Sequence, residues 1–432
     1  MNKPPSKSLS DLTATEIVSS IAAGKTTCER VARACLERIA ERDPKVLAWQ
    51  YVNPEQVIAY AKELDASGRG GPLRGVPFGV KDIIDTCDMP TEYGSPIYRQ
   101  HQPASDAACV ALSRKAGAVL MGKTVSTEFA YRHPAKTRNP LDPARTPGGS
   151  SSGSGAAVGD NMVPLAIGTQ TLASTIRPGS FCGVFAYRPT HGDLRCAGVK
   201  EVSSYLDTPG LFARSVPDIV LYRNVLLGIK PEPLEPLMQP LRIGFCRTYL
   251  WPKLEPHMQR SLEDAAQTLA RAGATVTELT LPPQFADIEE KSHRWISGFE
   301  MSRNMTWEIE HHWEKLSDTL RNGRLQDGLT CSFDRYRSAL QFAAHCRDQL
   351  GSIFNDYDIL ITASATGEAP VGLHSTGNGS LSVIWTTTHV PAMTVPVFSG
   401  PNGLPMGAQL IAKRGADRAL FAASQWIHQV LT

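Results

Sequence analysis

Four serines set among glycines are the residues of this 432-residue chain whose type and spacing best suit a reaction. They lie in GGSSSGSG, residues 148–155, and two more serines follow at Ser174 and Ser180. Glycine and serine at this density are typical of a flexible linker. The run leads, however, into the apolar segment MVPLAIG, residues 162–168, which suits a protein core. Three hypotheses follow: a tether, a phosphate-binding loop, or the site of a nucleophilic serine.

The residues around the serines separate these hypotheses. A P-loop needs a lysine after its second glycine, and residues 147–177 contain no lysine. A nucleophile elbow, G-x-S-x-G, is formally present at residues 149–153. An elbow directly follows a strand, whereas the preceding TRNPLDPARTPGG is rich in proline and turn residues. A linker would not join short apolar elements this compactly, so the elbow and the linker remain the weaker alternatives.

The elements that must position the serines alternate between strands and helices. GVPFGVKDII, residues 75–84, is an apolar run that predicts a buried strand ending at Lys81. Residues 106–124 predict a helix, a turn at Gly117 and a strand. Further strands are expected at 241–245, 275–281, 358–365, 391–398 and 407–412, with helices near 255–272 and 416–430. This alternation predicts an α/β fold with a mixed, mostly parallel twisted sheet covered by helices on both faces.

The N-terminal region carries two helix-start signals. Residues 13–16 and 26–29 each have threonine first and glutamate fourth, the pattern of a capping box. We expect the first helix to end at Gly24 and the second to stop before Pro44. Residues 215–355 are richer in charged and aromatic side chains, so we expect helices there that shape a pocket. The whole chain, 1–432, is then one single domain.

Composition excludes several classes of protein. Hydrophobic residues make up 42% and charged residues 20%, so the chain can bury a core and is not globally disordered. A net charge of +2 without a long charge run gives no case for nucleic acid or a membrane surface. The nine cysteines form no CxxC pair, and no HExxH occurs, so we expect neither disulfides nor a metal. The first residues do not match a secretory signal, so we expect a cytoplasmic protein.

Several motifs together indicate a family. GGSSSGS, followed by GTQTLASTIRPGSFCGVFAYRPTHG, resembles the amidase signature family, whose pattern runs GGSSGGS, GT-D/Q-T-G-G-S and FCGV-x-x-x-KPT. GVPFGVKDIIDT, TEYGSP, GKTVSTEFAY and VPAMTVPVFSGPNGLPMGAQLIA also resemble family segments, in family order. The signature core covers about 75–200, and only about 215–355 is not assignable.

The resemblance implies a Ser–cis-Ser–Lys triad of Ser174, Ser150 and Lys81. Ser174 matches the nucleophile, Ser150 lies 24 positions upstream, and Lys81 is the lysine of VKD. A serine hydroxyl attacks only after a base removes its proton, and lysine is a base only when neutral. The lysine pKa, about 10.4 in water, must therefore be lowered by burial. Ser150 would relay the proton between the other two residues and later to the leaving amine.

The resemblance also places the oxyanion hole and shows where this chain departs from the pattern. The backbone N–H groups of Thr171, Leu172, Ala173 and Ser174 are expected to bind the oxyanion. Leu172 and Ala173 replace the family's Gly-Gly, and Ser152 replaces the glycine that directly follows the two serines of GGSSGG. Side chains at 172 and 173 could crowd the acyl pocket or disturb a backbone that needs glycine.

Residues next to the proposed triad in the sequence have supporting roles in this interpretation. Arg177 could clamp a substrate carboxylate through two hydrogen bonds, or pair with a buried acid. Residues 169–171 are expected to hold the nucleophile loop. Asp82 is expected to be structural, because an ion pair with Lys81 would raise the pKa of the lysine.

The prediction is therefore an amidase that hydrolyses a small carboxylic amide through an acyl-enzyme on Ser174. The predicted enzyme needs no cofactor and no metal, and it binds neither nucleic acid nor membrane. A homodimer is compatible with the prediction. Two alternatives remain: the glutaminase-type subunit of an amidotransferase acting on charged tRNA, and a catalytically silent family member used as a scaffold. GTQT…STIR departs from the GTDTGGSIR of those subunits.

Overall fold

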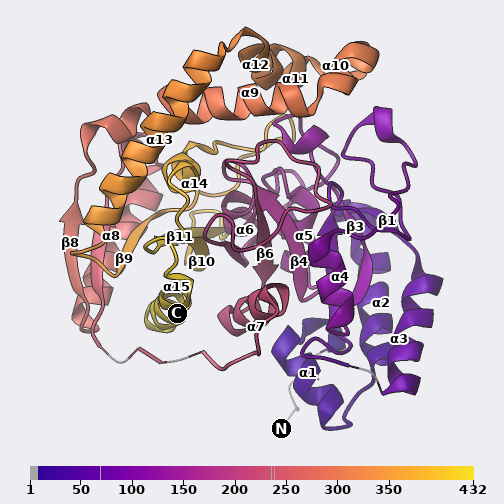
Figure 1. Cartoon of the computed structure of the whole chain (residues 1–432). Helices are drawn as coiled ribbons and strands as arrows, with labels where there is room; N and C mark the ends of the chain where they lie inside the picture. The colour runs from indigo at the N-terminus through magenta and orange to yellow at the C-terminus, as the bar shows by residue number, and fades with distance from the viewer. Residues whose placement is uncertain (1–7, 69, 235, 238) are drawn as a thin grey trace.

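One eleven-stranded sheet runs through the molecule, in the order β1-β3-β2-β4-β6-β5-β10-β11-β9-β7-β8 (Figure 1). The computed structural model describes residues 8–68, 70–234, 236–237 and 239–432. The strands are β1 (Trp49–Val52), β2 (Pro77–Lys81), β3 (Val119–Thr124), β4 (Leu165–Gln170), β5 (Phe185–Arg188), β6 (Thr208–Ala213), β7 (Arg242–Cys246), β8 (Thr275–Leu279), β9 (Ile359–Ala363), β10 (Ala392–Ser399) and β11 (Pro405–Ile411). All strands predicted from the sequence are therefore present.

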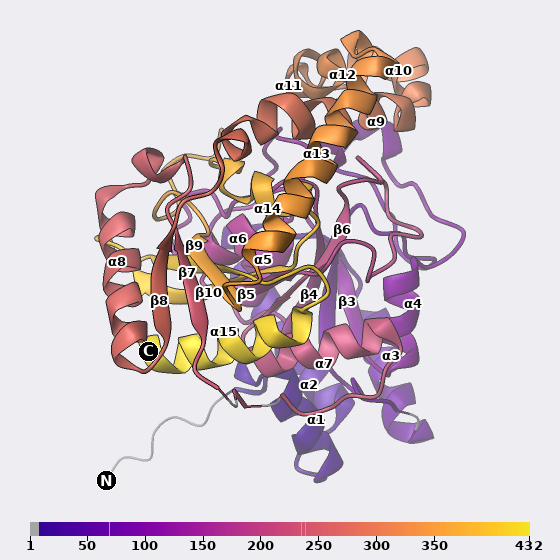
Figure 2. The ribbon, with the colours of Figure 1, turned by 60° about the vertical axis from the view of Figure 1, so that its left-hand side comes forward.

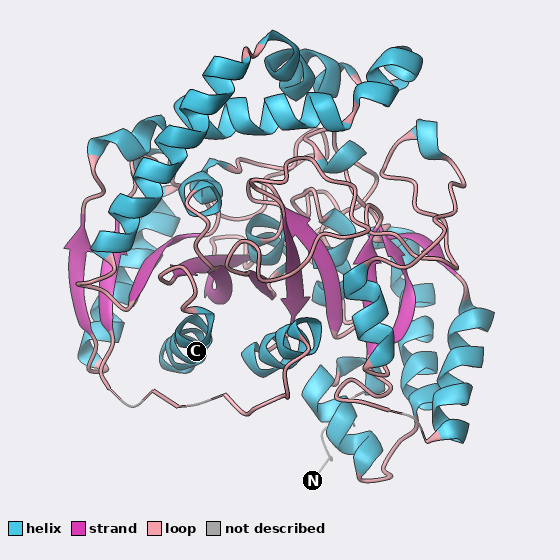
Figure 3. Ribbon diagram, in the orientation of Figure 1, coloured by secondary structure: helices cyan, strands magenta, loops and turns pink. Residues whose placement is uncertain are grey.

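Helices cover both faces of the sheet, as predicted (Figure 3). On one face lie α1 (Ala14–Ala22), α4 (Ala108–Lys115), α7 (Val216–Leu227), α8 (Pro256–Arg271) and α15 (Asp417–Leu431). On the other lie α2 (Cys28–Val46), α3 (Pro54–Ser67), α5 (Ser152–Gly159), α6 (Ile176–Cys182), α13 (Phe333–Ile353) and α14 (Val383–Thr387). A single α/β domain with a mixed sheet is thus confirmed.

The prediction of a mostly parallel sheet is wrong, because antiparallel pairings are in the majority. β2 pairs in parallel with β3 and β4, and β7 pairs in parallel with β8 and β9, whereas the other six pairings are antiparallel. The reason is that some strands lie in the sheet between two strands that would otherwise be parallel neighbours. β4 and β5 run in the same direction, as their connecting helix α6 predicts, but β6 lies between them and opposes both. β11 separates β9 from β10 in the same way.

Of the two N-terminal helix-start signals, the first is correct and the second is shifted by one residue. Thr13 caps α1 in a complete capping box, and Gly24 follows in the left-handed region. Helix α2 is capped by Thr27 instead of Thr26, because the Thr27 hydroxyl accepts the hydrogen bond from the third helical residue. Pro44 does not stop α2, which continues to Val46. A proline in the last turn removes only one helical hydrogen bond there, so the helix tolerates it.

A group of helices from residues 289–353, called the helical cap here, lies above one end of the sheet (Figures 1 and 2). It contains a π-helical turn (Glu289–His293), α9 (Arg294–Asn304), α10 (Thr306–His312), α11 (Asp318–Leu320), α12 (Gln326–Thr330) and α13. The cap belongs to the segment for which the sequence predicted pocket-shaping helices. Among the described residues, no helix is both long and apolar enough to cross a membrane.

Candidate active site

The site forms where two neighbouring parallel strands end. β2 and β4 pair in parallel, so Lys81, the last residue of β2, and Gln170, the last of β4, lie at the same edge of the sheet. Ligands of α/β proteins bind at this carboxyl edge. The Lys81 side chain is completely buried, and its Nζ donates to Ser150 Oγ at 2.6 Å and Thr169 Oγ1 at 2.9 Å. The structure thus brings Lys81 and Ser150 together.

The surroundings of Lys81 favour its neutral form. Burial lowers the pKa of Lys81 to about 7, against a smaller opposing effect of the Asp207 carboxylate. Asp82 does not pair with Lys81. Its carboxylate lies 3.6 Å from Lys123 Nζ and accepts from the Glu92 amide. The contacts of Asp82 therefore support the expectation that it is structural. Because no carboxylate among the described residues pairs with Lys81 directly, the Lys81 amine can be neutral and keep a lone pair available.

The glycine- and serine-rich segment is an ordered, buried part of the site. The Gly149–Ser150 peptide bond is cis, as the resemblance implies for Ser150. Helix α5 begins at Ser152 and is buried along nearly its whole length, which excludes a flexible linker. Ser151 ties this segment to β4, because its hydroxyl donates to the Thr169 carbonyl at 3.2 Å.

Ser174 lies in the loop 171–175 between β4 and α6, and its exposed fraction is 7%. The Gln170 side-chain oxygen accepts from the amides of Thr175 at 3.0 Å and Ile176 at 3.1 Å, which fixes both ends of the loop. The Ser174 carbonyl accepts from the Ser151 amide at 3.4 Å, so the two serine segments touch. Both Ser150 and Ser174 line one cavity.

Backbone donors of this loop are available to a ligand. Across the part of the chain that the structure describes, no acceptor is bonded to the amide N–H groups of Leu172, Ala173 and Ser174. Free, oriented amides beside a nucleophile are what an oxyanion hole requires. The Leu172 side chain is half-buried and packs on the apolar cluster to which Val383, Ile384 and Trp385 of α14 belong. Leu172 and Ala173 also border Gly379, where a side chain would meet Leu172 Cδ2 at 3.1 Å.

Arg177 is bonded to the protein through both of its terminal nitrogens, in a way that the sequence did not predict. Its guanidinium donates to the carbonyls of Gly377 and Gly149, both at 2.6 Å, and to Thr376 Oγ1 at 3.1 Å. Its partners among the described residues include no carboxylate, so pairing with a buried acid does not occur. The side chain thus fixes the peptide that precedes Ser150 and the loop 375–380 that walls the cavity.

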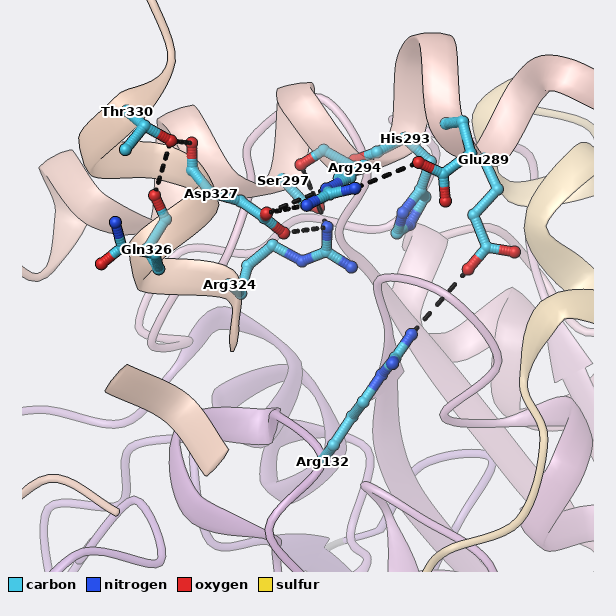
Figure 4. Close-up of polar contacts among 10 residues, drawn as sticks. Arg132, Glu289, His293, Arg294, Ser297, Arg324, Gln326, Asp327 and Thr330 are labelled. Carbon is cyan, nitrogen blue, oxygen red and sulfur yellow. Dashed lines mark hydrogen bonds and ion pairs between the residues drawn. The ribbon is translucent and has the colours of Figure 1, made fainter. Parts of the chain in front are cut away.

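The cavity has a volume of about 420 Å³, and its roof comes from the helical cap (Figure 4). Among the described residues, three arginines line it, Arg132, Arg177 and Arg324, against a single carboxylate, that of Glu289. His293 lines it as well. Sequence reasoning missed the residues from the cap, because they lie on helices without a glycine-dense motif. Only the expectation of pocket-shaping helices pointed to that region.

Comparisons with known proteins agree with this geometry. The amidase family model matches residues 30–421, and the chain therefore belongs to the amidase signature family, whose enzymes hydrolyse C–N bonds. A glutamyl-tRNA(Gln) amidotransferase subunit of Chloroflexus aggregans is 32% identical over 456 residues, 93% of each chain.

Two solved structures are similar over nearly their whole length. A crystal structure of an amidase superposes with a TM-score of 0.89 at 26% identity, covering 98% of this chain and 100% of the other. An inhibitor-bound vestigial protein complex, which bears on the origins of an s-triazine catabolic enzyme, gives 0.87 at 28% identity, covering 97% and 98%. The fold is that of the amidases.

Proposed function

We propose that this protein is an amidase that hydrolyses a carboxylic amide through an acyl-enzyme on Ser174. The observation that carries the proposal is that the buried Lys81 donates to Ser150 Oγ, while Ser150 and Ser174 line one cavity beside loop amides that no described residue bonds. Ammonia release from a panel of aliphatic, aromatic and acid-bearing amides tests it. Hydrolysis of at least one class is expected, and a folded protein inert to all of them would contradict it.

In the proposed mechanism, neutral Lys81 accepts the proton of Ser150, which takes the proton of Ser174. Ser174 Oγ then forms a bond to the substrate carbonyl carbon, and the amides of residues 171–174 bind the oxyanion. The C–N bond breaks as a proton returns through Ser150 to the leaving nitrogen. Water then attacks the acyl-enzyme by the same proton route and releases the acid. Thr169, bonded to Lys81 Nζ, keeps the amine oriented toward Ser150.

The excess of arginine in the cavity favours an acid-bearing amide. Arg324 is buried, and its bonds to other described residues use only Nη1, which donates to the Arg294 carbonyl at 3.1 Å and to Asp327 at 3.3 Å. Asp327 is already bound by Arg294 at 2.7 Å. Figure 4 shows the Arg324 guanidinium directed from the cap toward the space that Arg132 enters from below. A carboxylate on the substrate would bind the Arg324 guanidinium and offset the excess positive charge of the cavity.

Replacing Arg324 should therefore separate substrates by charge. In Arg324→Gln, kcat/KM for acid-bearing amides should fall roughly 10- to 150-fold, because a lost charge-assisted hydrogen bond costs about 1.5–3 kcal/mol. Neutral amides of the same size should change little. Arg294→Gln is the matched control, since Arg294 shares Asp327 but does not line the cavity. Equal losses for charged and neutral amides would remove Arg324 from substrate binding.

A second candidate is the glutaminase-type subunit of an amidotransferase, favoured by the likeness to the Chloroflexus aggregans protein. Glutamine is itself an acid-bearing amide, so the arginine-rich cavity fits this candidate too. The isolated chain distinguishes the two. We expect it to hydrolyse amides alone, whereas activity only on glutamine and only with a co-purifying second subunit would favour the amidotransferase.

Leu172 and Ala173 should restrict the acyl group instead of abolishing activity. Leu172 packs on the α14 cluster and against Gly379, so the loop accommodates it while its amides stay unbonded. In Leu172→Gly/Ala173→Gly we expect hydrolysis of bulkier acyl groups and little change for the best small substrate. If the side chains instead misplaced a donor, the double variant would gain about 10²–10³ in kcat on every amide. Steady-state kinetics over a graded acyl series decides between these outcomes.

A further inference from the structure

The carbonyl groups of residues 171–174, in the loop that carries Ser174, are each held by a different donor. The Ala173 carbonyl accepts from the Arg177 amide at 3.1 Å. The Ser174 carbonyl accepts from the Ser151 amide at 3.4 Å. The Leu172 carbonyl accepts from Thr386 Oγ1 of α14 at 2.8 Å. The Thr171 carbonyl lies 2.9 Å from His293 Nε2. Each peptide plane fixes its N–H opposite its C=O, so bonds that hold these carbonyls also orient the amides.

His293 is the donor that comes from the helical cap. It ends the π-helical turn that leads into α9, is 2% exposed and lines the same cavity as Ser174. Figure 4 shows its ring directed from the cap toward the space that Arg324 and Arg132 also face. A carbonyl only accepts hydrogen bonds, so Nε2 must carry the proton.

Its environment keeps His293 a neutral donor. Burial and the nearby Arg324 lower the pKa of His293 to about 3. Nδ1 is buried and has no hydrogen-bond partner among the described residues, so no second group in the protein competes for the orientation of the ring. The Thr171 side chain is held from the other side, because its hydroxyl donates to Asp207 at 2.5 Å. Thr171 is thus fixed between the sheet side and the cap.

We propose that His293 is a positioning residue, through which the helical cap sets the backbone of the oxyanion hole. This inference rests on the proposed amidase function and adds a residue that the signature motifs do not contain. His293 would not touch the reacting atoms. It would hold the Thr171 carbonyl away from the cavity, so that the Leu172 amide, which lies in the same peptide plane, faces the oxyanion.

The test is kinetic and uses the full chain. His293→Leu fills the volume without a donor, whereas His293→Gln supplies an amide N–H that can reach the Thr171 carbonyl. In the leucine variant kcat should fall roughly 10- to 100-fold, less than the 10²–10³ of losing a donor outright, with KM nearly unchanged. The glutamine variant should recover most of this loss. His345→Leu, an exposed histidine of the same cap, is the matched control and should keep wild-type kinetics.

A second readout separates positioning from general destabilisation. An aldehyde analogue of the substrate adds to Ser174 and places its oxyanion in the same hole, so its affinity should fall by the same factor as kcat. The affinity of the product acid should not change. Thr386→Val, which removes the donor to the Leu172 carbonyl and an acceptor for the Gln170 side-chain amide, should show the same pattern if His293→Leu fails to fold.

Three results would overturn the inference in an active enzyme: an unchanged kcat in a folded His293→Leu, a rise in KM alone, or a loss that glutamine does not recover. Wild-type protein that hydrolyses no amide would instead contradict the proposed function, so the two failures are distinguishable.

Discussion

Ser174→Ala should lose amide hydrolysis by at least about 10⁴-fold, because it removes the oxygen that forms the acyl-enzyme. The cavity and the loop amides remain, so substrate binding should survive. Single-turnover ammonia release and ligand titration measure the two effects separately.

Two serine variants control this result. Ser180 lies in the adjacent helix α6, outside the cavity, and among the described residues Ser180→Ala removes only an acceptor for the Gly407 amide. It should cost about 1 kcal/mol of stability and leave the activity in the same range. Ser150→Ala should lower the rate strongly because the proton relay is broken. A Ser174→Ala enzyme that still turns over, beside a dead Ser150→Ala, would reverse the assignment of the nucleophile.

Lys81→Met should lower the acylation rate by several orders of magnitude, since methionine fills the buried site without a base. In the wild type, kcat/KM should rise with pH, because only neutral Lys81 accepts a proton. With a Lys81 pKa of about 7, the rate should climb tenfold per pH unit below that value and level above it. The Lys81→Met residual activity should lack this acidic limb.

A variant of Asp207 tests whether the titration of Lys81 causes the rise of kcat/KM with pH. The Asp207 carboxylate raises the pKa of Lys81, so Asp207→Asn should move the acidic limb to lower pH. Near-wild-type activity of Lys81→Met at neutral pH would contradict the triad. It would direct attention to a histidine base, and His374 lines the cavity.

The sequence predicts the part of the site that short segments build. Lys81 ends a strand of continuous apolar residues, and Ser150 and Ser174 stand in motifs with fixed spacing, so local patterns place all three. The sheet order is not predictable in this way. Insertion of β6 between β4 and β5 depends on contacts between distant segments, and no local period encodes it.

The roof of the cavity was also beyond sequence reasoning. His293 and Arg324 come from helices whose charged residues resemble an ordinary solvated surface until the cap folds over the sheet. For Arg177 the sequence suggested a contact with substrate, whereas the structure shows contacts with the protein. The position of Arg177 beside Ser174 suggested a substrate clamp, yet its guanidinium is bonded to three protein groups. That it also contacts a substrate carboxylate stays a prediction, and Arg324 is the better-placed group.

Covalent labelling tests the central claim, an acyl-enzyme on Ser174, most directly. Wild-type protein is treated with a fluorophosphonate probe, digested, and the modified residue is located by mass spectrometry. We expect one adduct, on Ser174, which forms far more slowly in Lys81→Met and is absent in Ser174→Ala. An adduct on Ser150, or a wild-type protein that hydrolyses amides but resists the probe, would contradict the account.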